Sequence, residues 1–230
     1  MTPYRLACLT WPEVSERARQ GGMLAVPVGS TEQHGPHLPL SVDTDIALAL
    51  CDRLAATRSD VLVAPAVAYG SSGEHAGFAG TLSIGRDATN LLLLELGRSA
   101  TQTFGHVLFV SAHGGNAEAI TSAVDRLRAE SRDALLFQPR WDGEPHAGRA
   151  ETSMQLALRP HTVRVERGAR GDTRPLRELM PTLRTGGVRA VSPSGVLGDP
   201  GGATAEEGRA LLDRLTADLL AEVAAWRATG

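Results

Sequence analysis

The segment from Thr31 to Asp43 gathers groups that can bind a metal ion into one short turn after an apolar run. Glu32 and His34 are two residues apart, so an extended backbone points both side chains to one face. Asp43 follows a turn containing Gly and Pro that can fold back on them. Converging oxygen and nitrogen donors are what a divalent metal requires. The pattern predicts a metal site; the alternative is a polar loop with incidental histidines.

Four short apolar runs predict strands that are buried on both faces, as in a parallel sheet covered by helices. The runs span residues 23–28, 61–67, 106–112 and 134–138. Helical patterns cover residues 45–57, 87–104, 116–130, 154–158 and 205–227, with Asp87 and Asn116 as expected N-caps. Alternating strands and helices predict one domain over residues 1–230, a three-layer α/β/α sandwich with a mostly parallel central sheet.

Polar side chains follow all four predicted strands. In open α/β sheets, ligands bind beyond the carboxyl ends of the strands. Glu32 and His34 follow the first run, Ser72, Glu74 and His75 the second, His113 the third, and Trp141, Glu144, His146 and Glu151 the fourth. Four strands therefore deliver polar groups to one edge of the sheet, which favours a composite site over any single motif.

Each of these residues also has an ordinary structural interpretation. His113 could be a hydrogen-bonded histidine at a strand end, and Glu151 could complement a helix dipole. Glu74 and His75 could orient metal ligands or anchor a loop, and the residues alone do not decide between these roles. His146 lies in a Gly-containing loop and has room to act as a proton carrier.

Composition and charge exclude several classes of protein. A chain of 230 residues with 42% hydrophobic and 21% charged residues fits a globular domain with a full core. A net charge of −3 does not favour nucleic acid or an anionic membrane, and no apolar run could span a bilayer. The N-terminal segment Met1–Arg5 lacks a signal-peptide pattern, and Cys8 and Cys51 form no disulfide framework. We therefore expect a cytoplasmic protein.

Eight arginines lie between residues 159 and 189. They are Arg159, Arg164, Arg167, Arg170, Arg174, Arg177, Arg184 and Arg189. One interpretation is a solvated or subunit-facing surface. The other is that one or more of them bind a substrate carboxylate. On the second interpretation, neutralising Arg170 or Arg174 raises KM more than it lowers kcat.

The segment Pro27–Pro39 resembles the signature of the creatininase family of metal-dependent amidohydrolases. Asp43, His113–Asn116 and Glu151–Ser153 follow in the order expected for that family, and the resemblance covers nearly the whole chain. It implies a three-layer α/β fold, usually assembled as a homo-oligomeric hexamer. It also implies two divalent metal ions per subunit, which could be zinc, iron or manganese.

The resemblance also assigns metal ligands. It implies that Glu32 and His113 bind one metal ion, that His34 binds the other, and that Asp43 bridges both. Creatininase has a carboxylate two residues after its metal-binding histidine, whereas this chain has Gly115 there. The second ion therefore needs another carboxylate, and Glu151 is the candidate.

The expected reaction is hydrolysis of an amide C–N bond, with two cations activating a water and polarising the scissile carbonyl. His146, with Glu144, is expected to protonate the leaving nitrogen. The candidate substrate-binding residues are Ser72, Glu74, His75 and Trp141; the last could correspond to the tryptophan that closes over the substrate in creatininase, although its spacing to His146 differs.

Within the family, the sequence is most similar to peptidases that release a C-terminal Val-Tyr dipeptide from a modified precursor peptide during the biosynthesis of a redox cofactor. The modified peptide is therefore the expected partner. Hydrolysis of a small cyclic amide or a formamide is the alternative reaction. A non-catalytic metal-binding scaffold in a maturation complex is the alternative outside enzymes.

Overall fold

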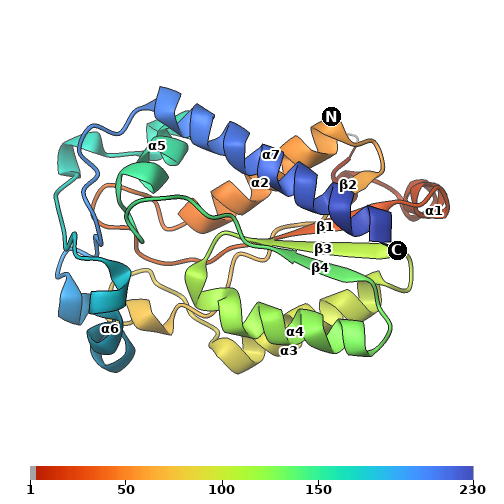
Figure 1. Cartoon of the computed structure of the whole chain (residues 1–230), viewed down its shortest axis with the longest axis horizontal. Coiled ribbons are helices and arrows are strands. Elements are labelled where there is room, and N and C mark those ends of the chain that lie inside the picture. Colours follow the sequence, from red (N-terminus) through yellow and green to blue (C-terminus); the bar gives the residue numbers. More distant parts are fainter. Residues whose placement is uncertain (1–3, 230) are drawn as a thin grey trace.

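The computed structural model describes residues 4–229, and its centre is a four-stranded parallel sheet (Figure 1). The strands are β1 (Met23–Val28), β2 (Val61–Val63), β3 (His106–Ser111) and β4 (Ala134–Phe137), in the spatial order β2-β1-β3-β4. In the register of the sheet, Ala25 lies opposite Val63 on one side and Leu108 on the other. All four predicted strands are confirmed, but β2 is shorter than predicted because Pro65, which has no backbone N–H, follows closely.

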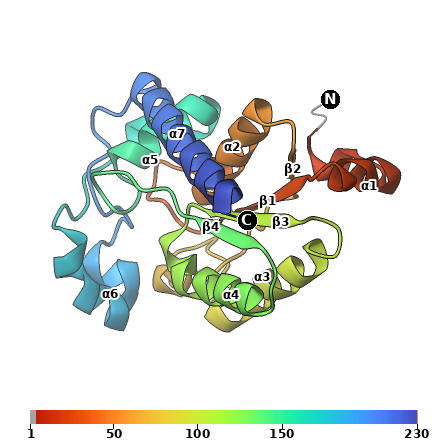
Figure 2. The same ribbon diagram turned by 45° about the vertical axis from the view of Figure 1, so that its right-hand side comes forward.

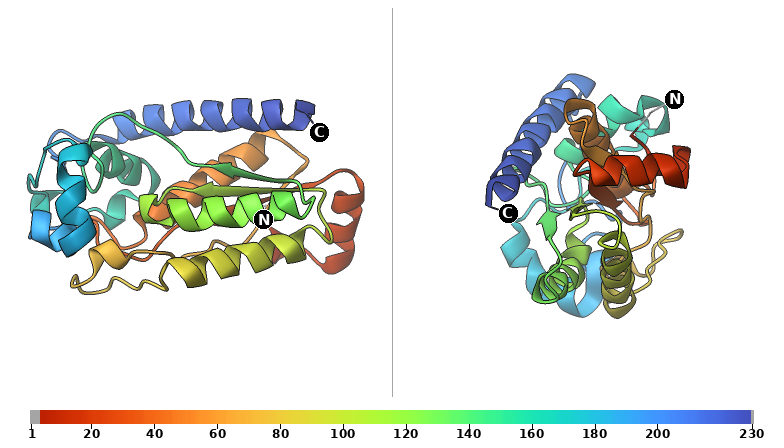
Figure 3. Two further views of the ribbon diagram at one scale, coloured as in Figure 1. Left: turned by 60° about the horizontal axis from the view of Figure 1, so that its bottom comes forward. Right: turned by 90° about the vertical axis from the view of Figure 1, so that its right-hand side faces the viewer.

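Helices cover both faces of the sheet and form the two outer layers (Figure 1). One face carries α2 (Val42–Thr57), α5 (Arg149–Leu158) and α7 (Ala205–Thr229), and the other carries α3 (Arg86–Ala100) and α4 (Ala117–Ala129). The two groups stay on opposite sides of the sheet in the turned views of Figure 2 and Figure 3. The predicted three-layer α/β/α sandwich is therefore confirmed.

Strand β1 shows why the apolar runs are continuous. Met23 and Ala25 pack into the core that contains α2, α5 and α7. Leu24, Val26 and Val28 pack into the other core, against α3 and α4. Successive side chains of a strand point to opposite faces, so a strand between two helical layers needs apolar residues at every position.

Two helices were not predicted from the sequence. Helix α1 (Trp11–Arg19) begins at a capping box formed by Thr10 and Glu13. Helix α6 (Leu176–Val191) lies in the arginine-dense segment, at the end of the molecule to which the strands point (Figure 1). Pro181 lies inside α6 and Gly187 interrupts its helical backbone, and both features hide a helix from a periodicity search.

Several predicted helix ends were wrong. Helices α2 and α5 begin at Val42 and Arg149, earlier than predicted, so Asp43 and Glu151 both lie in a first helical turn. The N-cap of α3 is Gly85, and Asp87 lies inside its first turn. Short 3-10 turns complete the chain at Leu6–Cys8, Gly73–His75, Gly114–Asn116, Pro160–Thr162 and Val165–Arg167.

Residues 1–3, part of the segment that lacks a signal-peptide pattern, lie outside the described residues, as does Gly230. Within residues 4–229, none of the helices combines the length and the apolar character needed to cross a bilayer.

Helices α5 and α7 approach each other so closely that only glycine fits at one position. A Cβ atom at Gly208 would lie 1.8 Å from the carbonyl oxygen of Ser153. In an open helix, Gly→Ala stabilises by roughly 1 kcal/mol. Here we expect Gly208→Ala to destabilise the protein by about 1–3 kcal/mol, because the helices must separate. Urea unfolding measures the change in the free energy of unfolding. Arg209→Ala, at the exposed neighbouring position, is the control and should change stability little. A Gly208→Ala variant more stable than wild type would refute the close contact.

Candidate metal centre

The side chains that could bind metal form one group, called here the donor cluster, where the loop after β1 meets the start of α2. The donor cluster consists of Glu32, His34, Asp43, His113, His146 and Glu151. A Cβ atom at Gly29 would lie within 2.5 Å of the backbone of Thr44, so only glycine lets the strand end lie against this helix. The Thr44 hydroxyl donates a hydrogen bond of 3.0 Å to the Ser30 carbonyl. The Glu32 amide donates one of 3.1 Å to the Leu40 carbonyl, which closes the loop. The predicted return of the chain is therefore confirmed.

The Asn116 side chain links the segments that follow three strands. Its side-chain amide donates a hydrogen bond of 2.9 Å to the Gly29 carbonyl, after β1. Its side-chain oxygen accepts one of 2.9 Å from the amide of Ser71, in the loop after β2. Asn116 itself follows β3. Asn116 is the N-cap residue of α4, as predicted, but its side chain makes no capping hydrogen bond and instead holds these two loops.

Asp43 lies between two imidazoles, one on each carboxylate oxygen. Its Oδ1 is 3.4 Å from Nε2 of His34, and its Oδ2 is 3.3 Å from Nδ1 of His113. The hydroxyl of Ser30 also donates to Oδ2. All of these side chains are buried. A carboxylate with a nitrogen donor beside each oxygen has the geometry of a bridging ligand between two ions.

Backbone carbonyls fix which nitrogen of each imidazole faces Asp43. The Nδ1–H of His34 donates to the Glu32 carbonyl at 3.2 Å, which leaves Nε2 to face Asp43. The Nε2–H of His113 donates to the Ser71 carbonyl at 2.9 Å, which leaves Nδ1 to face Asp43. A second hydrogen bond of this kind is the usual way in which proteins orient a metal-binding imidazole.

The carboxylate of Glu32 is fully buried and accepts no hydrogen bond from the described residues. Its nearest groups are imidazoles: Oε2 is 3.2 Å from Nε2 of His113, and Oε1 is 3.3 Å from Nε2 of His75. The Nε2 atom of His34 also lacks a hydrogen-bond partner within residues 4–229. Buried polar atoms without partners are costly unless a cation satisfies them. The donor set therefore fits a divalent metal.

Glu151 combines the two roles that the sequence left open. In the first turn of α5, its Oε2 accepts a hydrogen bond of 2.5 Å from the amide of Ala147. The same oxygen lies 4.0 Å from Nε2 of His34, and the side chain is 4% exposed. Glu151 thus accepts a backbone hydrogen bond at the start of α5 and also faces the rest of the donor cluster.

The donors form three groups whose atoms lie within 4.8 Å of one another. They are Glu32–Asp43–His113, His34–Asp43–Glu151 and Glu32–His34–His146. The first two groups share Asp43, so two ions could lie on either side of it. The third group gives His146 a possible role as a ligand, besides the role in proton transfer expected from the sequence.

Gln33 is a site residue that the sequence argument missed. Its side-chain amide donates to Nδ1 of His75 at 2.8 Å and to the Gly195 carbonyl at 3.2 Å. The backbone carbonyl of Gln33 accepts a hydrogen bond of 2.9 Å from Nε2 of His146. Gln33 therefore fixes the rings of both histidines, and Nδ1 of His146 is left facing Oε1 of Glu32 at 3.9 Å. The only signal in the sequence was its position between Glu32 and His34.

The structure places the remaining candidates differently. Glu74 and His75 line a cleft over the donor cluster. Ser72 is fully buried behind His113, with its hydroxyl 3.4 Å from Nε2. Glu144 and Trp141 border a neighbouring hollow, which shares Pro145 and Leu176 with the cleft, and they belong to none of the three donor groups. The fourth strand-end loop therefore brings His146 into the cluster but leaves Glu144 and Trp141 outside it.

Gly115 makes room for Glu74. A Cβ atom at position 115 would lie 2.2 Å from Oε1 of Glu74 and 2.5 Å from Nε2 of His113. The Glu74 oxygen in turn lies 3.7 Å from that nitrogen of His113. The space opened by the glycine is thus filled by a carboxylate from the loop after β2.

Burial and charge pairing divide the histidines into two kinds. Burial alone would lower the pKa of His34, but Asp43, and then Glu151 and Glu32, raise it to about 9. Burial lowers the pKa of His75 to about 4 and that of His146 well below its usual value. His75 and His146 are therefore neutral at pH 7, whereas His34 binds a proton in the metal-free protein.

The carboxylates respond in opposite directions. Burial opposes ionisation of Asp43, but the His34 and His113 imidazoles outweigh it and hold the Asp43 pKa well below its usual value. Burial raises the pKa of Glu151 to about 7, against the lowering effect of His34. Groups with such perturbed pKa values cluster at functional sites.

A parallel α/β sheet with buried imidazoles and carboxylates at its carboxyl edge defines a metal-dependent hydrolase. The family model for creatinine amidohydrolase, creatininase, matches residues 7–223. The chain therefore belongs to the creatininase family. Members of this family are metal-dependent amidohydrolases, so the chain is an enzyme that hydrolyses amide C–N bonds.

Individual relatives are similar over most of the chain. Mycofactocin precursor peptide peptidase from Mycobacterium ulcerans is 47% identical, and the alignment covers 94% of this chain and 86% of that protein. Creatinine amidohydrolase from Pseudomonas putida is 31% identical, and the alignment covers 69% of this chain and 73% of that protein. A crystal structure of creatinine amidohydrolase, 25% identical, covers 96% of both chains with a TM-score of 0.84. Solved creatininase structures include a Zn–Zn form and an Mn form.

Gly115→Ala should weaken metal binding, because the new methyl group displaces Glu74 or His113. We expect the affinity for zinc or manganese to fall by about 10- to 100-fold, as when the surroundings of a metal ligand are disturbed. Metal content after dialysis against a chelator measures this. Gly114→Ala is the matched control, since a Cβ atom at Gly114 meets nothing within 4 Å. Equal metal content in both variants would contradict the assignment.

Metal binding should weaken as the pH falls. Because the pKa of His34 in the metal-free protein is about 9, an ion must displace a proton below that pH. We expect apparent affinity to drop by at least about tenfold per pH unit from pH 9 towards pH 7, because His34 releases one proton and because, against the lowering effect of burial, Glu32 and Asp43 also raise the pKa of His113 well above its usual value. Chelator competition at these pH values measures the slope, and proton uptake instead of release would contradict it.

The same raised pKa affects the stability of the metal-free protein. A group whose pKa is higher in the folded state stabilises that state fully below its unfolded pKa, here about 6.5. That stabilisation is lost as the pH rises through about 9. Thermal unfolding with a chelator present should show this loss, and His34→Gln should remove the pH dependence that His34 contributes.

Proposed function

We propose that this protein is a peptidase with two divalent metal ions per subunit, which releases the C-terminal Val-Tyr dipeptide from the modified mycofactocin precursor peptide. The observation that carries the proposal is the pair of donor groups that share Asp43, one of which reaches an open cleft through Glu32 and His113. The 47% identity to a mycofactocin precursor peptide peptidase supports the choice of substrate. Zinc, iron and manganese all suit these mixed donors.

The proposed ligands follow the donor groups. Glu32 and His113 would hold one ion, His34 and Glu151 would hold the other, and Asp43 would be shared by both groups. Divalent ions bound there would lower the pKa of a water and polarise the scissile carbonyl. The surrounding apolar core keeps these side chains dry, which strengthens every charge interaction at the site.

His146 is the proposed proton carrier. It lines the cleft, is neutral at pH 7, and presents Nδ1 towards Glu32 because Nε2 is engaged by the Gln33 carbonyl. A neutral imidazole can take a proton from an attacking water and return it to the leaving nitrogen. Glu144 is the less supported partner, because it borders a different hollow.

The alternative reactions fit this site less well. Hydrolysis of a small cyclic amide would be the proposal if the creatinine amidohydrolase of Pseudomonas putida were the better guide, but the chain is 31% identical to it. The cleft, at about 490 Å³, exceeds what such a small amide requires. A non-catalytic scaffold does not require an open cleft that reaches the donors.

Three further proposals concern the organisation and the location of the protein. We propose a single domain, because one sheet organises the helices within residues 4–229. We propose a homo-oligomer, as the family resemblance implies, and exposed Leu91 and Leu92 on α3 offer apolar surface for it. A cytoplasmic location fits the two free cysteines, Cys8 and Cys51.

The cleavage assay tests the proposed function. Purified protein loaded with zinc, iron or manganese should release Val-Tyr from the modified precursor peptide, as mass spectrometry would show. Asp43→Asn should lower the rate by at least about 100-fold, because it removes the charge that both ions share. Asp125→Asn, at an exposed position on α4 outside the donor groups, should remain active. Failure of every metal-loaded form to cleave, or a fully active Asp43→Asn variant, would refute the proposal; creatinine and formamide substrates test the alternatives.

A further inference from the structure

The cleft over the donor cluster has two chemically different sides. Its volume is about 490 Å³, and Glu32, His113 and His146 lie on the side of the proposed metal ions. The opposite wall is largely apolar and comes mainly from α6. Its members are Leu176, Met180, Leu183, Arg184 and Val188, together with Leu197. A ligand bound here therefore meets the catalytic groups at one end and α6 at the other.

Helix α6 is packed firmly enough to form a wall. Leu179 and Val188 are buried in a small cluster with Leu197. A Cβ atom at Gly187, where φ is +67°, would lie 2.6 Å from the Glu74 carbonyl, so the helix meets the Glu74 loop through backbone contact. The Arg189 guanidinium donates a hydrogen bond of 2.6 Å to the Gly77 carbonyl. The wall thus has a fixed position relative to the catalytic groups.

Arg184 is the one arginine or lysine among the described residues that line this cleft. It is exposed, and no hydrogen bond or ion pair engages it within residues 4–229. Arg174, by contrast, pairs with Asp172 at 2.6 Å and borders the neighbouring hollow instead of the cleft. Arg170 donates to the Thr173 hydroxyl and does not line the cleft. An unpaired guanidinium beside an apolar wall is suited to bind a carboxylate.

We propose that Arg184 binds the terminal carboxylate of the peptide fragment that the enzyme releases, while the apolar wall of α6 receives the side chains of that fragment. This inference rests on the proposed function and names the residue that selects the end of the substrate. It replaces Arg170 and Arg174, the candidates chosen from the sequence, with a residue that faces the catalytic groups.

The dimensions and charges of the cleft support this orientation. A volume of about 490 Å³ suits a fragment of a few residues and not a folded partner. The proposed metal ion at Glu32 and His113 takes up the scissile carbonyl, so the remaining positive charge on the cleft lining for a terminal carboxylate is Arg184. A substrate therefore lowers its energy by placing its C-terminus at α6 and its scissile amide at the donor cluster.

Binding of a free dipeptide tests the proposal directly. Isothermal calorimetry would compare Val-Tyr with Val-Tyr-amide on the metal-loaded enzyme and on Arg184→Gln. We expect wild type to bind the acid about 10- to 100-fold more tightly than the amide, the range for a charge-assisted hydrogen bond. Arg184→Gln should lose this preference and should bind the amide as wild type does.

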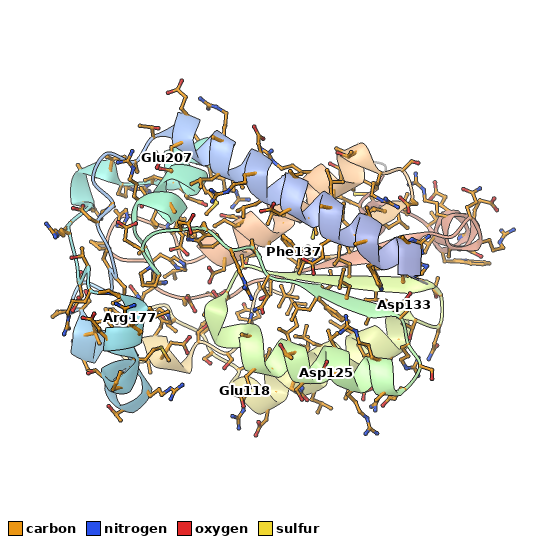
Figure 4. The ribbon with its side chains drawn as sticks, in the orientation of Figure 1. Glu118, Asp125, Asp133, Phe137, Arg177 and Glu207 are labelled. Atoms are coloured by element: carbon orange, nitrogen blue, oxygen red, sulfur yellow. The ribbon has the colours of Figure 1, made fainter. Side chains whose placement is uncertain are left out.

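Arg177→Gln is the matched control. Arg177 lies two turns earlier on α6, at the end of the molecule to which the strands point (Figure 4), and does not line the cleft. This variant should keep the preference for the acid. Arg184→Lys should keep part of it, because the charge remains but the planar pair of donors is lost.

Cleavage kinetics separate this inference from the proposed function. With precursor peptides ending in an acid or an amide, Arg184→Gln should raise KM for the acid about 10- to 100-fold and change kcat little. Equal effects on both peptides, or no preference for the acid in wild type, would overturn the role of Arg184. Absence of all cleavage with an intact binding preference would overturn the proposed function and leave Arg184 as the carboxylate-binding residue.

Discussion

The structure depends on one carboxylate, Asp43, that lies between the imidazoles of His34 and His113 in the protein interior. A buried charge is stable only when its partners are held in place, because the interior supplies no water to replace them. The surrounding architecture meets this requirement: Gly29 lets β1 end against α2, and Asn116 joins three strand ends. Each histidine is also fixed by a backbone carbonyl.

This arrangement concentrates negative charge in the interior. Glu32, Asp43 and Glu151 are all buried, and Glu32 accepts no hydrogen bond from any described residue. In the metal-free protein, protonated His34 offsets part of this charge, which is why its pKa rises to about 9. Divalent ions would offset it more completely, so the same electrostatic imbalance explains both the affinity for metal and its dependence on pH.

The catalytic groups and the proposed specificity residue belong to different parts of the fold. The donors lie in the loops after the parallel strands and in the first turns of α2 and α5. Arg184 lies on α6, a helix with an internal Pro181 and a kink at Gly187, outside the three layers. Such a division lets substrate preference change through a peripheral helix while the metal ligands keep their geometry.

The sequence by itself determined the parallel sandwich, because strands buried on both faces must be apolar at every position, as β1 is. It also predicted that Glu32, His34 and His113 would come together, since strand ends of a parallel sheet meet at one edge, and that the chain would fold back to bring Asp43 to them. Only the tertiary structure decided that Gln33 orients two histidines, that Glu74 fills the space beside Gly115, and that α6 walls the cleft. These are contacts between loops distant in sequence, and local periodicity contains no information about which loops will touch.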